Sequence, residues 1–302
     1  MKKAILSFST ILLMLVMIIG CSTLTQDDDK FTFDVTCDMR QYAGPEYQDS
    51  TYFLGSLIAL KKVGLGEFMV SPGDIDPPWH IKNSIDSVLG SDYYWYPVVG
   101  NHEAETVEDM QYLREYLSKD IPHLTKRGPV NATETMYSFD FKNVHFSVIN
   151  QYYDGVCDDT LDGDISEQTL AWLKEDLEEN KKPVTFVLGH EPIVSLPDIE
   201  NGRHRHKGDN LDKYPENSIK FQKLLREYNV RAYLCGHTHN LSVAKLNGIW
   251  QIDAGHARGI GDQGARSTFL KVNIDGNSVT VDAYRSLENW KDYELTHSFV
   301  ID

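Results

Sequence analysis

The sequence predicts an α/β fold in which mixed β-sheets are covered by helices. Short apolar strands alternate with amphipathic helices over most of the 302 residues, and the C-terminal part is rich in strands joined by hairpin turns. Alternation followed by hairpins favours mixed sheets with helices outside them. Polar motifs follow directly after several strands, which is where open α/β sheets gather their ligands.

The first half of the chain predicts strands that each lead into a helix. Residues 51–62, for example, carry Phe53, Leu54, Leu57 and Ile58 at helical spacing. The predicted elements are a strand at 31–37, a helix at 51–62, a strand at 68–70, a helix at 81–89, a strand at 96–99 and a helix at 106–118.

The second half begins with a predicted hairpin and ends in β-structure. Residues 136–141 and 144–150 form strands on either side of a turn at Lys142-Asn143, and Ser166 can cap the helix that follows. Asn247-Gly248 and Asp275-Gly276 mark later turns. The other predicted elements are a strand at 184–188, a helix at 218–228 and a strand at 232–235.

The N-terminus predicts export. Lys2 and Lys3 precede an apolar run at 4–20, which is short for a membrane-spanning helix and typical of a signal peptide. The run ends at Gly20-Cys21, which resembles the cleavage and acylation site of a bacterial lipoprotein. The alternatives are an ordinary signal peptide with a chance cysteine, or an uncleaved anchor. From the lipoprotein-like junction we expect a signal peptide at 1–20, a tether at 21–30 and one folded domain at 31–302.

An acylated Cys21 would hold the protein on the outer side of a membrane without spanning it. Removal of 1–20 would move the formal charge from −16 to −18, because only two lysines are lost. A surface this acidic argues against binding to a nucleic-acid backbone. The remaining cysteines, Cys37, Cys157 and Cys235, are odd in number, which excludes a full disulfide framework.

Five segments each place a potential metal ligand at the end of a predicted strand. Carboxylates, imidazoles and an amide oxygen suit Mn, Fe or Zn, and the absence of cysteine ligands disfavours a structural zinc site. The segments contain Asp38; Gly73-Asp74; Gly100-Asn101-His102-Glu103; Gly189-His190; and Gly236-His237-Thr238-His239.

This ordered set resembles the calcineurin-like metallophosphoesterase superfamily from about residue 31 to the C-terminus. Residues 71–76 and 96–103 are most similar to extracytoplasmic lipoprotein members. The resemblance implies a four-layer α/β/β/α sandwich of two mixed sheets flanked by helices. It also implies two divalent or trivalent transition-metal ions, Mn, Fe or Zn.

The resemblance further assigns roles to individual residues. Asp74 would bridge the two metals. Asn101, His190 and His237 would hold one of them, and Asp38 and His239 the other. A water between the ions would lose a proton and attack phosphorus as a metal-bound hydroxide.

Two residues beside the metals would assist catalysis. His102 would donate a hydrogen bond or a proton to the leaving-group oxygen. Glu103 would either orient that imidazole or serve as the first acidic residue of the following helix.

The first motif departs from the family pattern at Arg40. The family's first motif usually reads Asp-x-His, whereas Arg40 stands at the histidine position and cannot ligate a metal. Either the first metal site is weaker, or its metal is lost and the charge of Arg40 partly replaces it. Arg40 could also bind the substrate phosphate, or lie on the surface away from the site.

Other side chains could line the cleft. Residues 200–210 carry a basic stretch that could overhang the site and meet an anionic substrate, or form a solvated loop. This stretch is Arg203, His204, Arg205, His206 and Lys207. The strand-end residues His256, Arg258, Tyr152, Tyr153 and Asp154 could form its walls.

The predicted function is metal-dependent hydrolysis of a phosphomonoester or small phosphodiester outside the cell membrane. The alternative is a catalytically impaired cell-surface protein that binds a ligand on the same fold. A purely structural lipoprotein would leave the six potential metal ligands unexplained.

Overall fold

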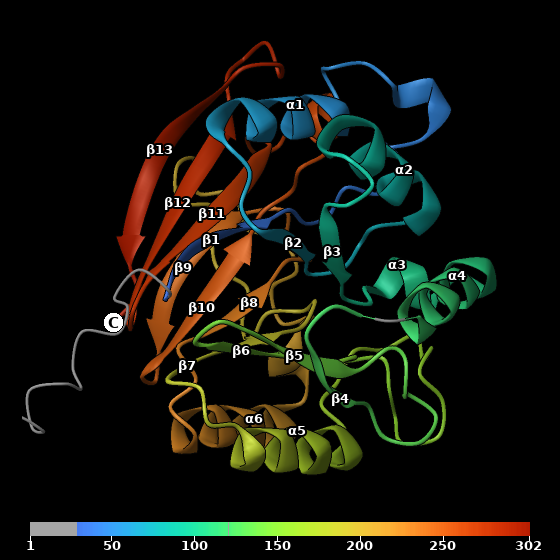
Figure 1. Ribbon diagram of the computed structural model, residues 1–302, viewed down its shortest axis with the longest axis vertical. Helices are drawn as coiled ribbons and strands as arrows, with labels where there is room; N and C mark the ends of the chain where they lie inside the picture. The colour runs from blue at the N-terminus through green and yellow to red at the C-terminus, as the bar shows by residue number, and fades with distance from the viewer. Residues whose placement is uncertain (1–28, 120) are drawn as a thin grey trace, which may run out of the picture.

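The computed structural model describes residues 29–119 and 121–302 (Figure 1). The predicted signal peptide, Cys21 and all but the last two residues of the predicted tether lie outside the described residues. Within the described ranges, no helix is both long enough and apolar enough to cross a membrane.

The first of two mixed sheets has six strands. Its centre is parallel, with Val35 of β1 opposite Val70 of β2, and Val70 opposite Tyr96 of β3. The C-terminal strands continue the sheet from β1 in antiparallel order. In spatial order the strands are β13 (Tyr293–Val300), β12 (Ser278–Ser286), β11 (Thr268–Asp275), β1 (Lys30–Val35), β2 (Phe68–Ser71) and β3 (Tyr94–Pro97).

The second sheet has seven strands, and its four central strands are parallel. The strands at both edges pair antiparallel to this centre. In spatial order the strands are β4 (Leu124–Arg127), β5 (Tyr137–Phe141), β6 (Val144–Val148), β7 (Val184–Leu188), β8 (Ala232–Cys235), β10 (Ile249–Ala254) and β9 (Leu241–Leu246).

The two sheets pack face to face, and helices cover their outer faces (Figure 1). An aromatic cluster fills the space between the sheets; Phe33 stacks on Phe68 with ring centroids 5.5 Å apart. The first sheet is covered by α1 (Phe53–Val63), α2 (Pro78–Leu89) and α4 (Val107–Ser118), and the second by α5 (Glu167–Glu179) and α6 (Pro215–Glu227). The four-layer sandwich is therefore confirmed.

The predicted elements are present, with ends shifted by a few residues. The β7 and β8 strands have the predicted bounds, and the Ser166 hydroxyl accepts the Thr169 amide at 3.1 Å, as expected of a helix cap. The strand β4 was not predicted, and the C-terminal strands β9 to β13 were predicted only as a β-rich part without individual bounds. The short helices α3 (Asn101–Ala104), η1 (Pro45–Tyr47), η2 (Leu211–Lys213) and η3 (Gly259–Gly261) were also not predicted.

Candidate metal centre

The six potential ligands follow the carboxyl ends of parallel strands in both sheets. Asp38, Asp74 and Asn101 come after β1, β2 and β3, respectively. His190 follows β7, and His237 and His239 follow β8. Because the carboxyl ends of parallel strands meet at one edge of a sheet, the topology brings these loops together.

The loops hold these side chains in strained backbone conformations. The left-handed region, which side-chain-bearing residues rarely adopt, contains Asp38 (φ 53°), Asp74 (φ 53°), His237 (φ 70°) and His239 (φ 59°). Such strain is maintained only where the surrounding structure enforces it, and it clusters at functional sites.

Two glycines allow the loops to approach one another closely. Gly73 has φ 85°, and a Cβ atom there would lie 2.4 Å from Nδ1 of His190. A Cβ atom on Gly236 would lie 1.9 Å from the Cys37 sulfur. Larger residues at these two positions would therefore displace a potential ligand or its neighbour.

Three potential ligand atoms surround Nε2 of His190. Oδ1 of Asp74, Oδ1 of Asn101 and Nδ1 of His237 each lie 3.2 Å from it. Separations of this size suit atoms that share one ion at bond lengths of about 2.0–2.2 Å. These four residues therefore fit a metal ion, as the family resemblance implied.

The surrounding structure fixes His190 in the ligating tautomer. Its Nδ1 donates to the Pro72 carbonyl oxygen at 2.7 Å, which leaves the lone pair of Nε2 facing the other ligands. Oε1 of Gln151, which follows β6, accepts the amides of His190 and Glu191, both at 2.6 Å. Gln151 therefore anchors the loop that carries His190.

The electrostatics of the centre favour a cation. Burial lowers the pKa of His190, but the carboxylates of Asp74 and Asp38 outweigh it and raise the pKa to about 10. Burial and nearby Asp74 raise the pKa of Asp38 to about 7. Burial also raises the pKa of Asp74, but His190 and His102 outweigh this effect and hold it well below its usual range. A metal ion would replace the proton on His190 as the charge that balances these carboxylates.

The remaining imidazoles are held neutral, which is the form that binds metal. Burial, then the positive charge of His190, keeps the pKa of His237 well below its usual range. Burial and the guanidinium of Arg258 do the same for the pKa of His239.

The first ligand group, which corresponds to the first metal site of the sequence analysis, consists of Asp38, Asp74 and His239. Their ligand atoms lie within 4.8 Å of one another, and Nε2 of His239 is 3.4 Å from Oδ1 of Asp38. This Asp38 oxygen is buried without a hydrogen-bond partner among the described residues, so a nearby cation, either a metal ion or the guanidinium of Arg258, would stabilise its charge. Asp262 lies 2.6 Å from Nδ1 of His239 and orients its ring.

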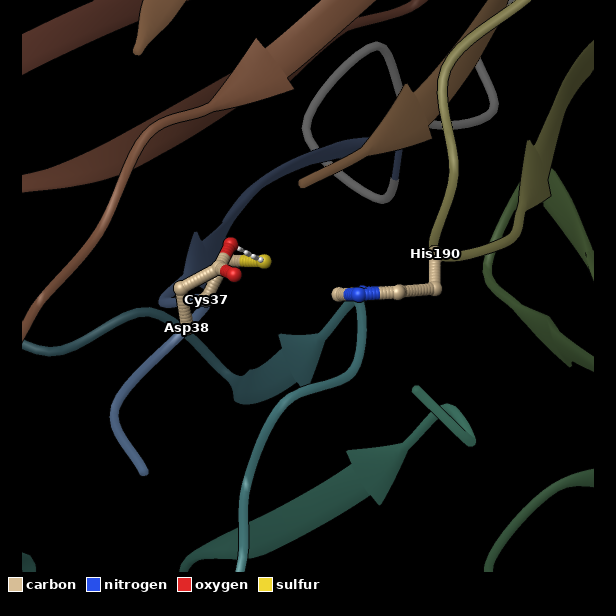
Figure 2. Close-up of side chains that lie close together, drawn as sticks. All are labelled: Cys37, Asp38 and His190. Carbon is tan, nitrogen blue, oxygen red and sulfur yellow. Dashed lines mark hydrogen bonds between the residues drawn. The ribbon is translucent and has the colours of Figure 1, made fainter. Parts of the chain in front are cut away.

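Cys37 also lies beside this centre (Figure 2). Its thiol donates to Oδ2 of Asp38 at 2.9 Å, and burial, together with Asp38, raises the pKa of this thiol well above its usual range. A metal ligand must be a thiolate. Cys37 therefore orients Asp38 as a hydrogen-bond donor, a role that its apolar sequence context did not reveal.

His102 borders the centre, but Glu103 does not contact its ring. Nε2 of His102 lies 3.7 Å from Oδ2 of Asp74, and its Nδ1 lies 3.1 Å from Glu105. The buried Glu103 carboxylate accepts the amides of Gly100 at 2.7 Å, Asp74 at 3.1 Å and Ile75 at 2.7 Å. Of the two expectations for Glu103, the structure shows the acidic residue in the first turn of α3, whose carboxyl group turns inward. The expectation that it orients His102 is corrected, because Glu105 lies beside the ring.

Arg40 lies at the edge of the site. Its Nε is 3.1 Å from Oδ1 of Asp76, and its side chain is 27% exposed. Within the described ranges Arg40 forms no ion pair with Asp38 or Asp74. Among the described residues, the Arg40 side chain pairs with Asp76 and forms no hydrogen bond or ion pair with the potential ligands.

The basic stretch reaches the metal centre. Arg205 contacts Nδ1 of His239, and the ring of His206 lies 4.2 Å from that of His237. Arg203 forms an ion pair with Asp262 at 2.9 Å. Of the two expectations for this segment, the structure shows the one in which it overhangs the site.

The other candidate wall residues take different positions. Tyr152 is buried and donates to Glu191 at 3.0 Å, while Tyr153 donates to the carbonyl oxygen of Val130 at 2.8 Å. Asp154 is exposed in a turn. His256 is buried, with Nε2 facing the Ala265 carbonyl oxygen at 3.1 Å, so among the β10-loop candidates it is Arg258 that contacts a ligand.

The fold and the ordered ligands together are those of the metallophosphoesterase class. The chain belongs to the calcineurin-like phosphoesterase family, whose model matches residues 68–241, more than half of the chain.

Similarity to individual proteins extends to acid phosphatases. Tartrate-resistant acid phosphatase type 5 of Oryctolagus cuniculus is 35% identical over 95 residues, which is 30% of this chain and 25% of that protein. The Homo sapiens protein is 27% identical over 179 residues, 53% of this chain and 48% of that protein. The chain thus spans about a quarter to a half of the length of these relatives.

Solved structures share the fold at low identity. Purple acid phosphatase PPD1 from yellow lupin (Lupinus luteus) aligns with a TM-score of 0.61 at 13% identity, covering 91% of this chain and 54% of that chain. GAP50, described as the anchor in the inner membrane complex of Plasmodium, aligns with a TM-score of 0.57 at 17% identity, covering 91% and 89%.

Proposed function

We propose that this chain is a metal-dependent phosphoesterase that hydrolyses a phosphomonoester or a small phosphodiester. The observation that carries the proposal is the convergence of Asp74, Asn101 and His237 on Nε2 of His190, each at 3.2 Å. Membership of the calcineurin-like family and similarity to acid phosphatases support a phosphate ester as the substrate.

Different residues would bind the metal and supply the proton. Asp74, Asn101, His190 and His237 would hold Mn, Fe or Zn, and a metal there supplies water activation and neutralisation of phosphoryl charge. His102, at the open side of Asp74, would supply a proton to the leaving oxygen.

The basic stretch would bind the substrate's phosphate. Arg205 presents a planar guanidinium suited to phosphoryl oxygens, and His206 lies beside it at the same edge of the centre.

The test is a substrate panel with controlled metal content. Protein stripped by chelation and reloaded separately with Mn, Fe or Zn should hydrolyse an aryl monoester or an aryl diester, and stripped protein should not. The preferred ester then distinguishes monoesterase from diesterase. Failure of every reloaded form on every ester would contradict the proposal.

A second candidate is a ligand-binding protein on the same fold. Two arginine side chains, those of Arg205 and Arg258, contact His239 of the first ligand group. A protein of this fold is described as a membrane-complex anchor, which supports considering a non-enzymatic role. Tight phosphate binding by metal-loaded protein that turns over no ester would favour this candidate.

We also propose that the protein is exported and anchored through lipidated Cys21, which rests on Lys2, Lys3 and the Gly20-Cys21 junction. Cys21→Ala should release the protein from membranes in cell fractionation. Equal retention of both forms after an alkaline wash, with no acyl label on the parent protein, would contradict lipidation.

A further inference from the structure

Arg258 is a buried arginine inside the first ligand group. It follows β10, and its residue is only 6% exposed. Its Nε donates to the Asp38 carbonyl oxygen at 2.8 Å, and its Nη2 lies 3.1 Å from Nε2 of His239. The Tyr42 ring lies 5.9 Å from the guanidinium carbon. These contacts on three sides fix the guanidinium next to His239.

The contact with His239 involves the nitrogen that would bind a metal. Nδ1 faces the Asp262 carboxylate at 2.6 Å, and because a carboxylate only accepts, Nδ1 carries the proton. Nε2 then has one lone pair, and this lone pair accepts a hydrogen bond from Nη2 of Arg258. In the opposite tautomer, with Nδ1 accepting from Arg205, Nε2 carries a proton and has no free lone pair. In both cases a metal must displace an existing interaction of His239.

The positive charge beside His239 also disfavours a metal ion there. Arginine is always cationic, and two guanidinium groups, those of Arg205 and Arg258, contact the His239 ring. A divalent ion on His239 would meet this positive charge in a buried site, where repulsion is poorly screened. Among the hydrogen bonds and ion pairs of the described residues, none joins an arginine side chain to the other ligand group. That group is Asp74, Asn101, His190 and His237.

We propose that the centre is asymmetric, with one tight metal site at Asp74, Asn101, His190 and His237, and with Arg258 as the resident cation at His239. This inference rests on the proposed function and refines its metal content. It assigns to Arg258 the charge replacement that the sequence suggested for Arg40, whose guanidinium pairs with Asp76 instead.

Metal stoichiometry tests the inference directly. Metal-free protein is titrated with Mn²⁺, separated from free ion and analysed for bound manganese, while its electron paramagnetic resonance spectrum distinguishes isolated ions from coupled pairs. The parent protein should retain one ion per chain with the spectrum of an isolated ion. Arg258→Met, which frees Nε2 of His239, should retain two and show coupling. Arg40→Met is the matched control and should still retain one.

A second variant covers the case in which Arg258→Met does not fold. His239→Ala should keep the single tight ion at unchanged affinity, because His239 does not hold it. A two-metal centre predicts that His239→Ala loses one ion or binds it more weakly than the parent does.

Three results would overturn the inference: two tight ions in the parent, one ion in folded Arg258→Met, or loss of the tight ion in His239→Ala. Two tight ions in a parent that turns over esters would overturn this inference alone and leave the proposed function standing. A parent that binds no metal would contradict the proposed function itself.

Discussion

Nε2 of His102 lies 3.7 Å from Oδ2 of Asp74, while its Nδ1 lies 3.1 Å from the Glu105 carboxylate. The His102 side chain is 25% exposed, whereas Asp74 is buried. The imidazole therefore stands between the buried ligands and solvent, which is the position that the proposed proton transfer to the leaving oxygen requires.

His102→Ala should lower turnover of an alkyl phosphate by about 10²–10⁴-fold, because a basic leaving oxygen needs a positioned acid. An aryl phosphate should lose much less, since its leaving group departs readily as an anion. The measurement is the rate on both esters together with the metal content of the same sample.

Asp74→Asn is the comparison, because it replaces a charged carboxylate ligand by a neutral amide and should lower metal content as well as rate. If His102→Ala loses metal to the same extent, His102 is itself a ligand and its assignment as a proton donor is wrong.

Glu103→Gln and Glu105→Gln test the corrected contact of His102. Glu103→Gln should lower stability and metal affinity, because both Glu103 oxygens accept backbone amides and the NH2 group of glutamine would face one of these donors. Glu105→Gln should leave both unchanged and lower only the rate on poor leaving groups. Thermal unfolding, metal titration and the two-ester assay separate the variants. Identical behaviour of the two would show that Glu103 and Glu105 do not have the different roles assigned to them.

Much of the fold was predictable because strong local patterns coincide with buried elements. The β7 and β8 strands are buried apolar runs that stop at Gly189 and Gly236, so pattern and boundary agree. In contrast, β4 reads Leu-Thr-Lys-Arg at a sheet edge, and the edge strand β13 is mostly exposed. Such strands depend on pairing with a neighbour far along the chain, and their own composition does not reveal it.

The ligands were predictable for a different reason. Each follows a glycine or an apolar strand in a fixed order, so the set can be recognised from the sequence without knowledge of the tertiary structure. The contacts of Arg258 and Asp262 with His239 and of Cys37 with Asp38 depend on how loops meet in space. A buried thiol also has the same sequence signature as a buried hydrophobic residue.

The ion pair between Arg285 and Asp198 should be important for stability. Both side chains are fully buried, and the guanidinium donates to Asp198 at 2.8 Å and 3.2 Å. Arg285→Met leaves the carboxylate buried without this partner, and should lower the free energy of unfolding by about 3–5 kcal/mol in denaturant titrations. Glu178→Gln, which breaks the exposed pair with Lys174, is the control and should leave the midpoint unchanged. If both substitutions lowered the free energy of unfolding equally, burial would not explain the importance of the Arg285–Asp198 pair.

His145 should make stability depend on pH. Burial lowers its pKa, but hydrogen bonds to Asp176 at 3.0 Å and Asp140 at 2.7 Å outweigh it and raise the pKa above 6.5. The protonated ring thus stabilises the fold fully below pH 6.5, and the contribution is lost as pH rises through the folded-state pKa.

Urea unfolding across this pH range should show the decline for the parent and a flatter profile for His145→Gln. The half-exposed His297 supplies the control variant, His297→Gln, which should keep the parent profile. A parent profile that rises with pH in this window, or an unchanged profile in His145→Gln, would contradict the assignment.

The most direct test of the metal-dependent phosphoesterase is the comparison of parent and His190→Ala, with bound metal and turnover of an aryl phosphate measured in one sample. His190 lies at the meeting point of the Asp74, Asn101 and His237 ligand atoms. We predict that the parent binds metal and turns over the ester, and that folded His190→Ala loses both together. Hydrolysis that persists in His190→Ala without bound metal, or a metal-loaded parent that hydrolyses no phosphate ester, would contradict it.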